Sequence, residues 1–163
     1  MLAQRAQAQT TPLQTPATSR GGRGVPRPFM KWAGGKAQLL KHYQSLLPSS
    51  WTRYFEPFIG GGAMFFEHGD ARSVLNDANP ELHNAYSVVQ DQVEELILAL
   101  REHEYDRDRY YAVRAQDPAD LSPVEAAART IYLNRTGFNG LYRVNKSGQF
   151  NVPFGRYTNP TIC

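Results

Sequence analysis

The residues with the clearest chemical potential are three consecutive glycines, Gly60, Gly61 and Gly62, and Asp77, which lies seventeen residues beyond Gly60. Glycines directly after an apolar strand let a ligand approach the backbone, and the helix that follows presents free N–H groups. In dinucleotide-binding folds an acid about 20 residues beyond the glycines accepts hydrogen bonds from ribose hydroxyls. The pair therefore predicts a site for a cofactor that contains adenosine. The alternative is that Asp77 only caps the helix predicted to begin near Pro80.

A second glycine-containing segment runs from Lys31 to Lys36. Its end resembles that of a phosphate-binding Walker A loop, but Met30 stands where that loop has its first glycine. Ala37 also replaces the hydroxyl residue that binds magnesium, so a nucleoside triphosphatase is excluded. We expect Trp32 and Lys36 to border the cofactor instead, one by stacking and the other by charge. The alternative is a buried aromatic ring and a solvated lysine.

A third segment, from Asn134 to Lys146, mixes arginine, asparagine and aromatic residues. These side chains read guanine edges, read adenine edges and stack on bases, respectively. Residues 126–163 contain five basic residues and no acid, which favours attraction to phosphates. The segment therefore predicts a nucleic-acid interface, and the alternative is a solvent-exposed basic hairpin without a partner.

Charge is strongly segregated along the chain, although the formal net charge is only +3. Residues 1–55 carry a charge of +8, residues 56–125 hold all 15 acids and carry −10, and residues 126–163 carry +5. This pattern favours an anionic partner that contacts both ends of the chain, with nucleic acid as the first candidate. The alternative is a basic tail combined with chance.

Composition excludes several classes of protein. No apolar run approaches the roughly 18 residues of a membrane span, so we expect no membrane association. The single cysteine, Cys163, permits neither an intramolecular disulfide nor a cysteine zinc site, and the four histidines show no ligand spacing. We therefore expect no metal and a reducing, cytoplasmic location.

The predicted elements position these residues. Residues 1–26 have the composition of a disordered tail. Apolar spacing predicts a helix over residues 33–47, which ends at Pro48. Residues 54–59 and 73–75 predict short strands on either side of the glycine turn and a helix, which together form a βαβ unit.

The second half of the chain is predicted to be mainly helical. The pattern is helical over residues 79–104, and Ser122, Pro123 and Glu125 form the capping box of another helix. Residues 141–145 and 149–154 predict two strands of a β-hairpin.

Three stretches of this sequence carry a family resemblance: residues 29–36, residues 55–63 together with Asn76 and Asp77, and residues 133–157. With them the chain resembles the Dam-type, D12-class DNA adenine N6-methyltransferases, from about Pro28 to its last residue. The family that the chain resembles includes enzymes of restriction-modification systems. It implies an α/β, Rossmann-like S-adenosylmethionine-dependent methyltransferase fold with an incomplete sheet and an inserted helical and β-hairpin target-recognition region.

The resemblance also assigns parts and residues. It implies a cofactor-binding part over residues 27–90 and a DNA target-recognition region over residues 91–163, and double-stranded DNA as the partner. The cofactor is S-adenosylmethionine, and the implied cofactor residues are Trp32, Lys36, Phe58, Gly60, Gly61, Gly62 and Asp77. The implied DNA-binding residues are Phe138, Asn139, Leu141, Arg143, Asn145, Pro153 and Arg156. Gln149 stands where the family often has an acid.

One family element is not found in these 163 residues: the catalytic Asp-Pro-Pro-Tyr. Asp117-Pro118-Ala119-Asp120 lacks the second proline and the aromatic residue, and an ordinary turn explains it. We therefore expect a truncated methyltransferase chain that is inactive alone and lacks a C-terminal catalytic half. The alternative is a non-catalytic DNA-binding or regulatory remnant of such an enzyme.

Overall fold

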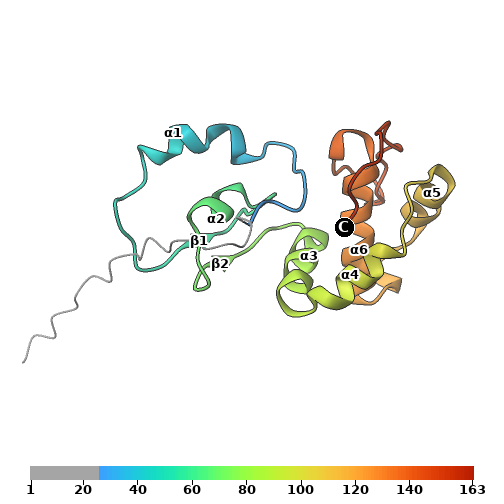
Figure 1. Cartoon of the computed structure of the whole chain (residues 1–163), viewed down its shortest axis with the longest axis horizontal. Coiled ribbons are helices and arrows are strands. Elements are labelled where there is room, and N and C mark those ends of the chain that lie inside the picture. Colours follow the sequence, from blue (N-terminus) through green and yellow to red (C-terminus); the bar gives the residue numbers. More distant parts are fainter. Residues whose placement is uncertain (1–25) are drawn as a thin grey trace, which may run out of the picture.

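The computed structural model describes residues 26–163 (Figure 1). The tail predicted for residues 1–26 falls, up to Val25, outside the described residues. The described chain combines helices with a small parallel sheet, as an α/β fold does. None of the helices in residues 26–163 is long and apolar enough to cross a membrane.

The first helical segment is shorter than predicted. A 3-10 helix, η1 (Lys36–Leu39), leads into helix α1 (Leu40–Gln44), so the predicted helix over residues 33–47 is wrong at both ends. Its start is displaced by Gly34, whose φ of +72° forms a turn closed by the Gly35 N–H and the Trp32 carbonyl. This turn keeps the glycine segment out of the helix.

The βαβ prediction is confirmed. Strand β1 (Phe55–Glu56), helix α2 (Ala63–His68) and strand β2 (Val74–Leu75) follow one another, and β1 pairs with β2 in parallel, with Phe55 opposite Val74. Both strands are shorter than predicted. Gly62 precedes α2 with a φ of +78°, a conformation that favours glycine.

The chain then forms four α-helices within the described residues (Figure 1): α3 (Pro80–Asp91), α4 (Val93–Arg101), α5 (Arg107–Ala115) and α6 (Pro123–Thr136). A short 3-10 helix, η2 (Pro118–Asp120), stands at the turn predicted there. The continuous helix predicted over residues 79–104 is wrong, because the backbone of Gln92 leaves the helical region and separates α3 from α4.

Helix α6 lies at the centre of the helical part. Its predicted capping box is confirmed, with Ser122 accepting from the Glu125 N–H and Glu125 accepting from the Ser122 N–H. One face of α6 packs against α3 and α4, and the other packs against α5 and against Phe150 and Val152. Burial on both faces explains why most of this helix is inaccessible to solvent.

The predicted hairpin is only partly formed. Residues 141–145 and 149–154 are connected by one isolated bridge, Val144 with Phe150, rather than by continuous strands. A second bridge joins Phe154 to Gly137, which precedes the predicted first strand. A 3-10 turn, η3 (Phe138–Gly140), introduces this segment. Phe150 and Val152 point into the core, so core packing replaces a regular ladder.

Candidate functional site

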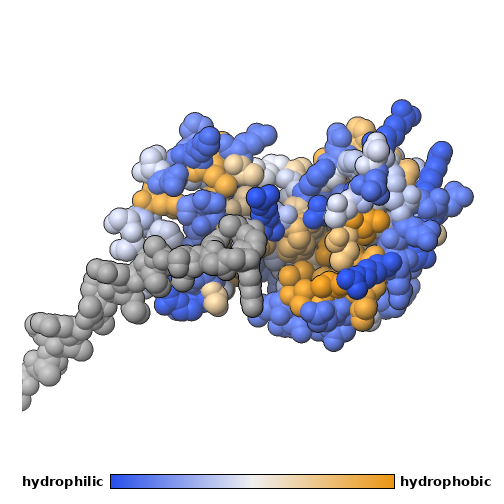
Figure 2. All heavy atoms as spheres, viewed as in Figure 1, coloured by the Kyte–Doolittle hydropathy of each residue, from blue (hydrophilic) through white to orange (hydrophobic). Residues whose placement is uncertain are grey.

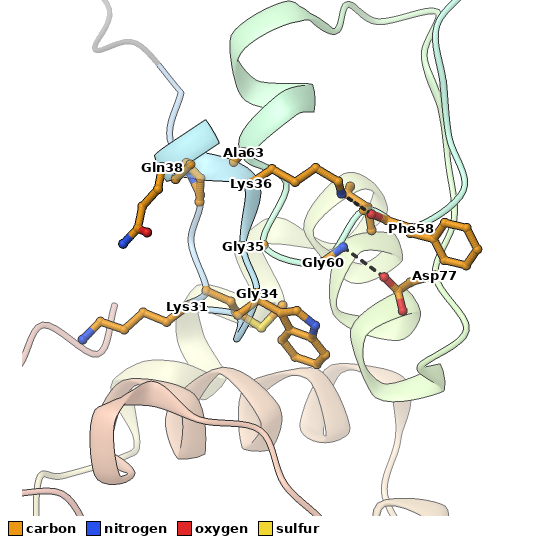
Figure 3. Close-up of a pocket in the computed structure, with 15 residues that line it drawn as sticks. Lys31, Gly34, Gly35, Lys36, Gln38, Phe58, Gly60, Ala63 and Asp77 are labelled. Atoms are coloured by element: carbon orange, nitrogen blue, oxygen red, sulfur yellow. Dashed lines mark hydrogen bonds between the residues drawn. The ribbon is translucent and has the colours of Figure 1, made fainter. Parts of the chain in front are cut away.

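An open cavity of about 660 Å³ lies between the two glycine segments. It gathers most of the predicted cofactor residues, which are far apart in the sequence. Its walls include Trp32, Lys36, Phe58, Gly60, Gly61 and Asp77. Gly62 is buried and starts α2 beside the cavity. Figure 3 shows that the lining comes from the Lys31–Lys36 segment, the turn after β1 and the end of β2.

Asp77 fastens two walls of this cavity together. Its Oδ2 accepts from the Gly60 N–H at 2.9 Å (Figure 3), and its Oδ1 accepts from the Asn79 N–H at 3.1 Å. The cap of α3 is Asn79, whose side chain accepts from the Leu82 N–H. The interpretation of Asp77 as the helix cap is therefore wrong. A carboxylate has about four acceptor positions, so Asp77 retains capacity for a ligand hydroxyl.

Lys36 is held rather than solvated. Its Nζ lies 3.1 Å from Glu56 Oε1 and donates to the Phe58 carbonyl, as Figure 3 shows for the latter. Glu56 is 6 % exposed, and its other oxygen accepts from the Tyr54 hydroxyl at 2.7 Å. Burial, with Glu56 nearby, raises the pKa of Tyr54, so its hydroxyl stays a donor. Because an ammonium has three donors, one remains for a ligand.

Trp32 packs directly against the glycine turn. A Cβ placed on Gly60 would lie 3.1 Å from Trp32 Cδ1, and one on Gly61 would lie 3.2 Å from the Met30 carbonyl oxygen. Glycine is therefore required for this close approach of the two segments. The half-buried indole lines the cavity.

Asn134 has a role that sequence reasoning missed. It is 4 % exposed, and its Oδ1 accepts from the Lys31 N–H while its Nδ2 donates to the Lys31 carbonyl, both at 2.8 Å. The same Nδ2 donates to the Gly140 carbonyl. Asn134 is thus unavailable to read a base edge, and its place in the predicted interface is corrected. The sequence signal for this role was the position of Asn134, a polar residue on the buried face of a predicted helix.

The predicted DNA-binding residues occupy one segment that follows α6, between residues 138 and 156. Six of the seven are exposed and Leu141 is half-buried; the exposed residues are Phe138, Asn139, Arg143, Asn145, Pro153 and Arg156. The two ends of the segment are joined by the Phe138 N–H, which donates to the Pro153 carbonyl at 2.9 Å. Asn139 has a φ of +55° in the η3 turn.

Two of these residues also make contacts within the hairpin. Arg143 Nε donates to Asn151 Oδ1 at 2.7 Å. Asn145 Oδ1 accepts from the Ser147 and Gln149 N–H groups, and its Nδ2 donates to Gln149 Oε1. Asn145 therefore holds the tip of the hairpin. To contact a phosphate, its Nδ2 group would have to use its second hydrogen or give up the hydrogen bond to Gln149.

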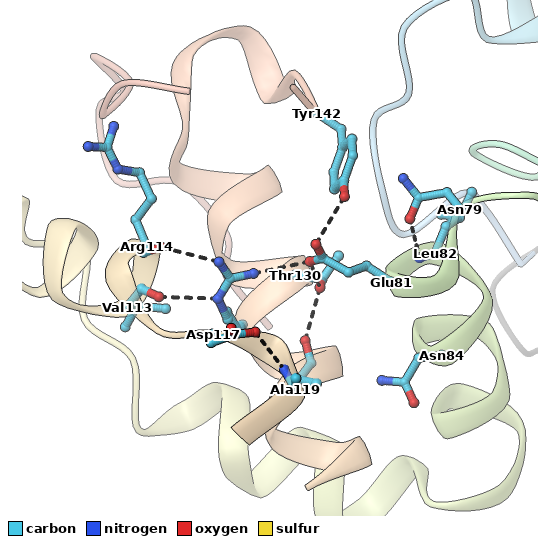
Figure 4. A network of polar contacts seen from close by, with 12 residues as sticks. Asn79, Glu81, Leu82, Asn84, Val113, Arg114, Asp117, Ala119, Thr130 and Tyr142 are labelled. Atoms are coloured by element: carbon cyan, nitrogen blue, oxygen red, sulfur yellow. Dashed lines mark hydrogen bonds and ion pairs between the residues drawn. The ribbon is translucent and has the colours of Figure 1, made fainter. Parts of the chain in front are cut away.

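A polar network joins the hairpin to the helices (Figure 4). Glu81, in the first turn of α3, accepts from the Tyr142 hydroxyl at 2.9 Å, from Thr130 Oγ1 at 2.9 Å and from Arg129 Nη1 at 3.1 Å. Arg129 is 2 % exposed and also donates to the Val113 and Arg114 carbonyls. Burial raises the pKa of Tyr142, which keeps its hydroxyl protonated.

No group of three or more His, Cys, Asp or Glu residues within 26–163 is arranged to hold a metal ion. The polar side chains that line the cavity are those of Lys31, Lys36, Gln38 and Asp77, and backbone amides of the glycine segments lie beside them. Such a set suits a ligand that carries hydroxyl and carboxylate groups.

Comparison with known proteins identifies the family. The sequence profile of the D12 class N6 adenine-specific DNA methyltransferases matches residues 32–162. The type II methyltransferase M1.LlaDCHI of Lactococcus lactis subsp. cremoris is 51 % identical over 142 residues, which cover 83 % of this chain and 50 % of that protein.

Two further relatives have the same relation to this chain. The type II methyltransferase M.MjaIII of Methanocaldococcus jannaschii is 40 % identical over 83 % of this chain and 54 % of its own length. The DNA adenine methylase of Haemophilus influenzae is 40 % identical over 80 % of this chain and 48 % of its own length. The chain therefore spans about half the length of these relatives, and it belongs to the D12 class of N6 adenine-specific DNA methyltransferases.

Proposed function

We propose that this chain supplies the S-adenosylmethionine-binding and DNA-recognition parts of an enzyme that methylates the N6 amine of adenine in double-stranded DNA. The observation that carries the proposal is the cavity in which Lys36, the glycine turn and Asp77 meet. The proposal includes a Rossmann-like fold in which residues 27–90 bind the cofactor and residues 91–163 recognise the target. It also includes a cytoplasmic location, where thiols stay reduced.

The cofactor has groups that these residues can bind. Gly60 and Gly61 let the turn lie directly against Trp32 and the Met30 carbonyl, and both glycines line the cavity. The free donor of Lys36 suits a carboxylate, and the free acceptor positions of Asp77 suit a ribose diol. Trp32 supplies apolar surface, and Phe58, whose carbonyl accepts from Lys36, also belongs to the lining. When bound, S-adenosylmethionine supplies an electrophilic methyl group.

The hairpin is the proposed DNA interface. Exposed aromatic, asparagine and arginine side chains lie in an acid-free segment, so phosphate attraction and base contacts come from the same surface. The contacts that Arg143 makes with Asn151 hold its guanidinium at this surface.

Methyl transfer needs groups that these 163 residues do not supply. The exocyclic amine of adenine is a poor nucleophile, because its lone pair is delocalised into the ring. The base must also be flipped out of the DNA duplex before the enzyme can reach it. The family's Asp-Pro-Pro-Tyr provides acceptors for that amine and a ring for the flipped base. We therefore propose that residues 1–163 alone bind cofactor and DNA but do not transfer methyl groups.

The proposed partner for catalysis is further methyltransferase polypeptide that extends the sheet. Phe55 is 56 % exposed on β1, Val74 is 46 % exposed on β2, and Phe58 is 70 % exposed just beyond β1. In Figure 3 the ring of Phe58 points away from the glycine turn. A two-stranded parallel sheet with apolar residues exposed is ordinarily covered by further elements, which supports this part of the proposal.

Calorimetry and a methyl-transfer assay test the proposal. Residues 1–163 are expected to bind S-adenosylmethionine, and Asp77→Ala is expected to abolish that binding, while the exposed control Asp70→Ala retains it. Unchanged affinity in Asp77→Ala would remove Asp77 from the site. With radiolabelled cofactor and adenine-containing duplexes no transfer is expected, so measurable turnover would overturn the proposed need for Asp-Pro-Pro-Tyr. Salt-dependent DNA binding without cofactor affinity would favour the alternative of a non-catalytic remnant.

A further inference from the structure

Two of the contacts that Tyr142 makes outside the hairpin lead to residues that line the cavity. Its ring stacks on Trp32, with centroids 5.1 Å apart and an interplanar angle of 27°. Its hydroxyl donates to Glu81 Oε1 at 2.9 Å, as Figure 4 shows. Tyr142 is also the immediate neighbour of Arg143 in the proposed DNA interface.

Both contacts continue to groups proposed to hold the cofactor. Trp32 itself lines the cavity and lies against Gly60. Glu81 lies in the first turn of α3, and the cap of that helix, Asn79, donates its N–H to Asp77. One hairpin side chain is therefore connected to the aromatic wall and to the carboxylate wall.

The Glu81 end of this connection is rigid. Arg129 and Thr130 of α6 both donate to Glu81 Oε2, and Arg129 is fixed in turn by two backbone carbonyls. The turn of the hairpin, residues 143–149, is by contrast exposed, and the hairpin is bridged at single points. If DNA shifts the hairpin, Tyr142 cannot carry Glu81 with it. The displacement must change the Tyr142–Trp32 stack or the Tyr142–Glu81 hydrogen bond.

The base of the hairpin lies against the same segment. Asn134 binds both Lys31 and Gly140, and a Cβ on Gly140 would approach the Lys31 Cδ to 2.5 Å. Lys31 directly precedes Trp32, so the backbone that carries the indole is the backbone against which the start of the hairpin is held. Tyr142 therefore acts on a ring whose backbone is already tied to the hairpin.

We propose that Tyr142 is a positioning residue that couples occupation of the DNA interface to cofactor affinity through Trp32. The inference rests on the proposed function, because it needs both ligands. Coupling between two sites is reciprocal, so DNA changes the affinity for S-adenosylmethionine by the same factor as the cofactor changes the affinity for DNA. Typical coupling factors are about 5 to 150.

The test measures that factor in residues 1–163. Trp51→Phe leaves Trp32 as the single tryptophan, and its fluorescence reports titration with S-adenosylmethionine, with and without a saturating pool of mixed-sequence duplexes. Without further change we expect the cofactor Kd to differ at least about fivefold between the two titrations. With Tyr142→Leu added we expect the ratio to fall to about one. Tyr142→Phe keeps the stack, and should restore part of the ratio.

A matched control separates coupling from simple loss of packing. Tyr111→Leu removes another half-buried tyrosine, one that packs beside Arg107 and Arg114 on α5 and is absent from the cavity lining. It should leave the ratio unchanged. If Tyr142 were merely structural, Tyr142→Leu would weaken both titrations equally and preserve the ratio, which would overturn the inference.

The remaining outcomes are also decisive. Binding of both ligands with a ratio of one before Tyr142 is changed overturns the coupling and leaves the proposed function standing. Failure to bind either ligand overturns the proposed function, and the coupling with it. If Tyr142→Leu does not fold, Tyr142→Phe decides, because loss of the Glu81 hydrogen bond should lower the ratio by at least about half. An unchanged ratio in that variant overturns the inference.

Discussion

The glycine-loop region, residues 26–79, and the helical region, residues 80–163, differ in how many of their apolar residues are buried. Of the sixteen hydrophobic residues that are buried within residues 26–163, only Met30 and Ile59 come from the glycine-loop region. Six of the ten large hydrophobic residues that remain exposed do come from it. On the face shown in Figure 2, hydrophobic atoms also reach the surface in both halves. The helical region buries its own apolar residues, while the glycine-loop region depends on contacts outside itself.

The difference shows how a ligand cavity is held by a region with little core of its own. Its walls are fixed by polar contacts, such as those of Asp77 with Gly60 and of Lys36 with Glu56, and by the attachment of Lys31 to Asn134. The last of these reaches into α6, the most buried helix of the described residues. The stable region therefore positions the less stable one.

Hydrogen exchange gives the largest expected contrast between the two regions. Amides of α6 should exchange only through global unfolding, with an opening free energy of about 5–15 kcal/mol, while those of η1 and α1 should open at about 0–2 kcal/mol. The reason is that η1 and α1 contribute no buried residue. Mass spectrometry of exchanged peptides measures this. Equal protection of both peptides would contradict the comparison.

Glu81→Ala should weaken the link between the hairpin and the helices. It leaves the Arg129 side chain, which is 3 % exposed, without its carboxylate partner, and losing one partner of a buried ion pair costs about 3–5 kcal/mol. Urea unfolding followed by circular dichroism measures the change. The control Asp70→Ala removes the exposed pair with Arg72 and should have a much smaller effect. A similar loss in both variants would show that burial does not set the cost.

A pair of glycine substitutions compares the surroundings of one backbone conformation in the two regions. Gly62 and Gly148 both have a φ of +78°, but a Cβ on Gly62 would lie 2.5 Å from the Tyr86 hydroxyl, and one on Gly148 meets nothing within 4 Å. Gly148→Ala should therefore cost only the backbone strain of about 1–2 kcal/mol, and Gly62→Ala that strain plus about 1–3 kcal/mol for the steric clash. Thermal unfolding of both variants measures the difference. Equal destabilisation by the two substitutions would show that α2 can move away from Tyr86 and relieve the clash.

The smallest expected effect is the pH dependence contributed by His103 in the helical region. Burial lowers the pKa of His103, and the Arg109 guanidinium lowers it further, so the folded state favours the neutral ring. The unfolded chain binds a proton at higher pH, so this contribution is complete above about pH 6.5 and is lost as the pH falls below it.

The melting temperature measured between pH 7.5 and 5.5 should therefore fall less in His103→Gln than in the parent chain. The exposed His83→Gln serves as the control. An identical slope in the parent chain and in His103→Gln would remove His103 as the source of the pH dependence.

Local signals determined much of the fold. Ser122, Pro123 and Glu125 fix the start of α6, because a capping box satisfies backbone donors that only nearby residues can reach. The glycine turn and its flanking apolar residues likewise determine the βαβ unit. The break at Gln92 and the helix α5 could not be predicted so well, since α5 buries only Tyr110 and Val113 and its apolar pattern is weak.

The candidate site divides in the same way. The sequence by itself determined which residue types gather at the glycine turn and which segment carries exposed basic and aromatic side chains, because those features depend on spacing and composition. Only the tertiary structure decided that Glu56 anchors Lys36, that Asn134 turns inward, and that Tyr142 lies between Trp32 and Glu81. These pairs are separated by 20 to 110 residues. Packing of the helical region against the glycine-loop region brings Asn134 to Lys31 and Tyr142 to Trp32, whereas the folding of each region by itself forms the Lys36–Glu56 and Tyr142–Glu81 pairs.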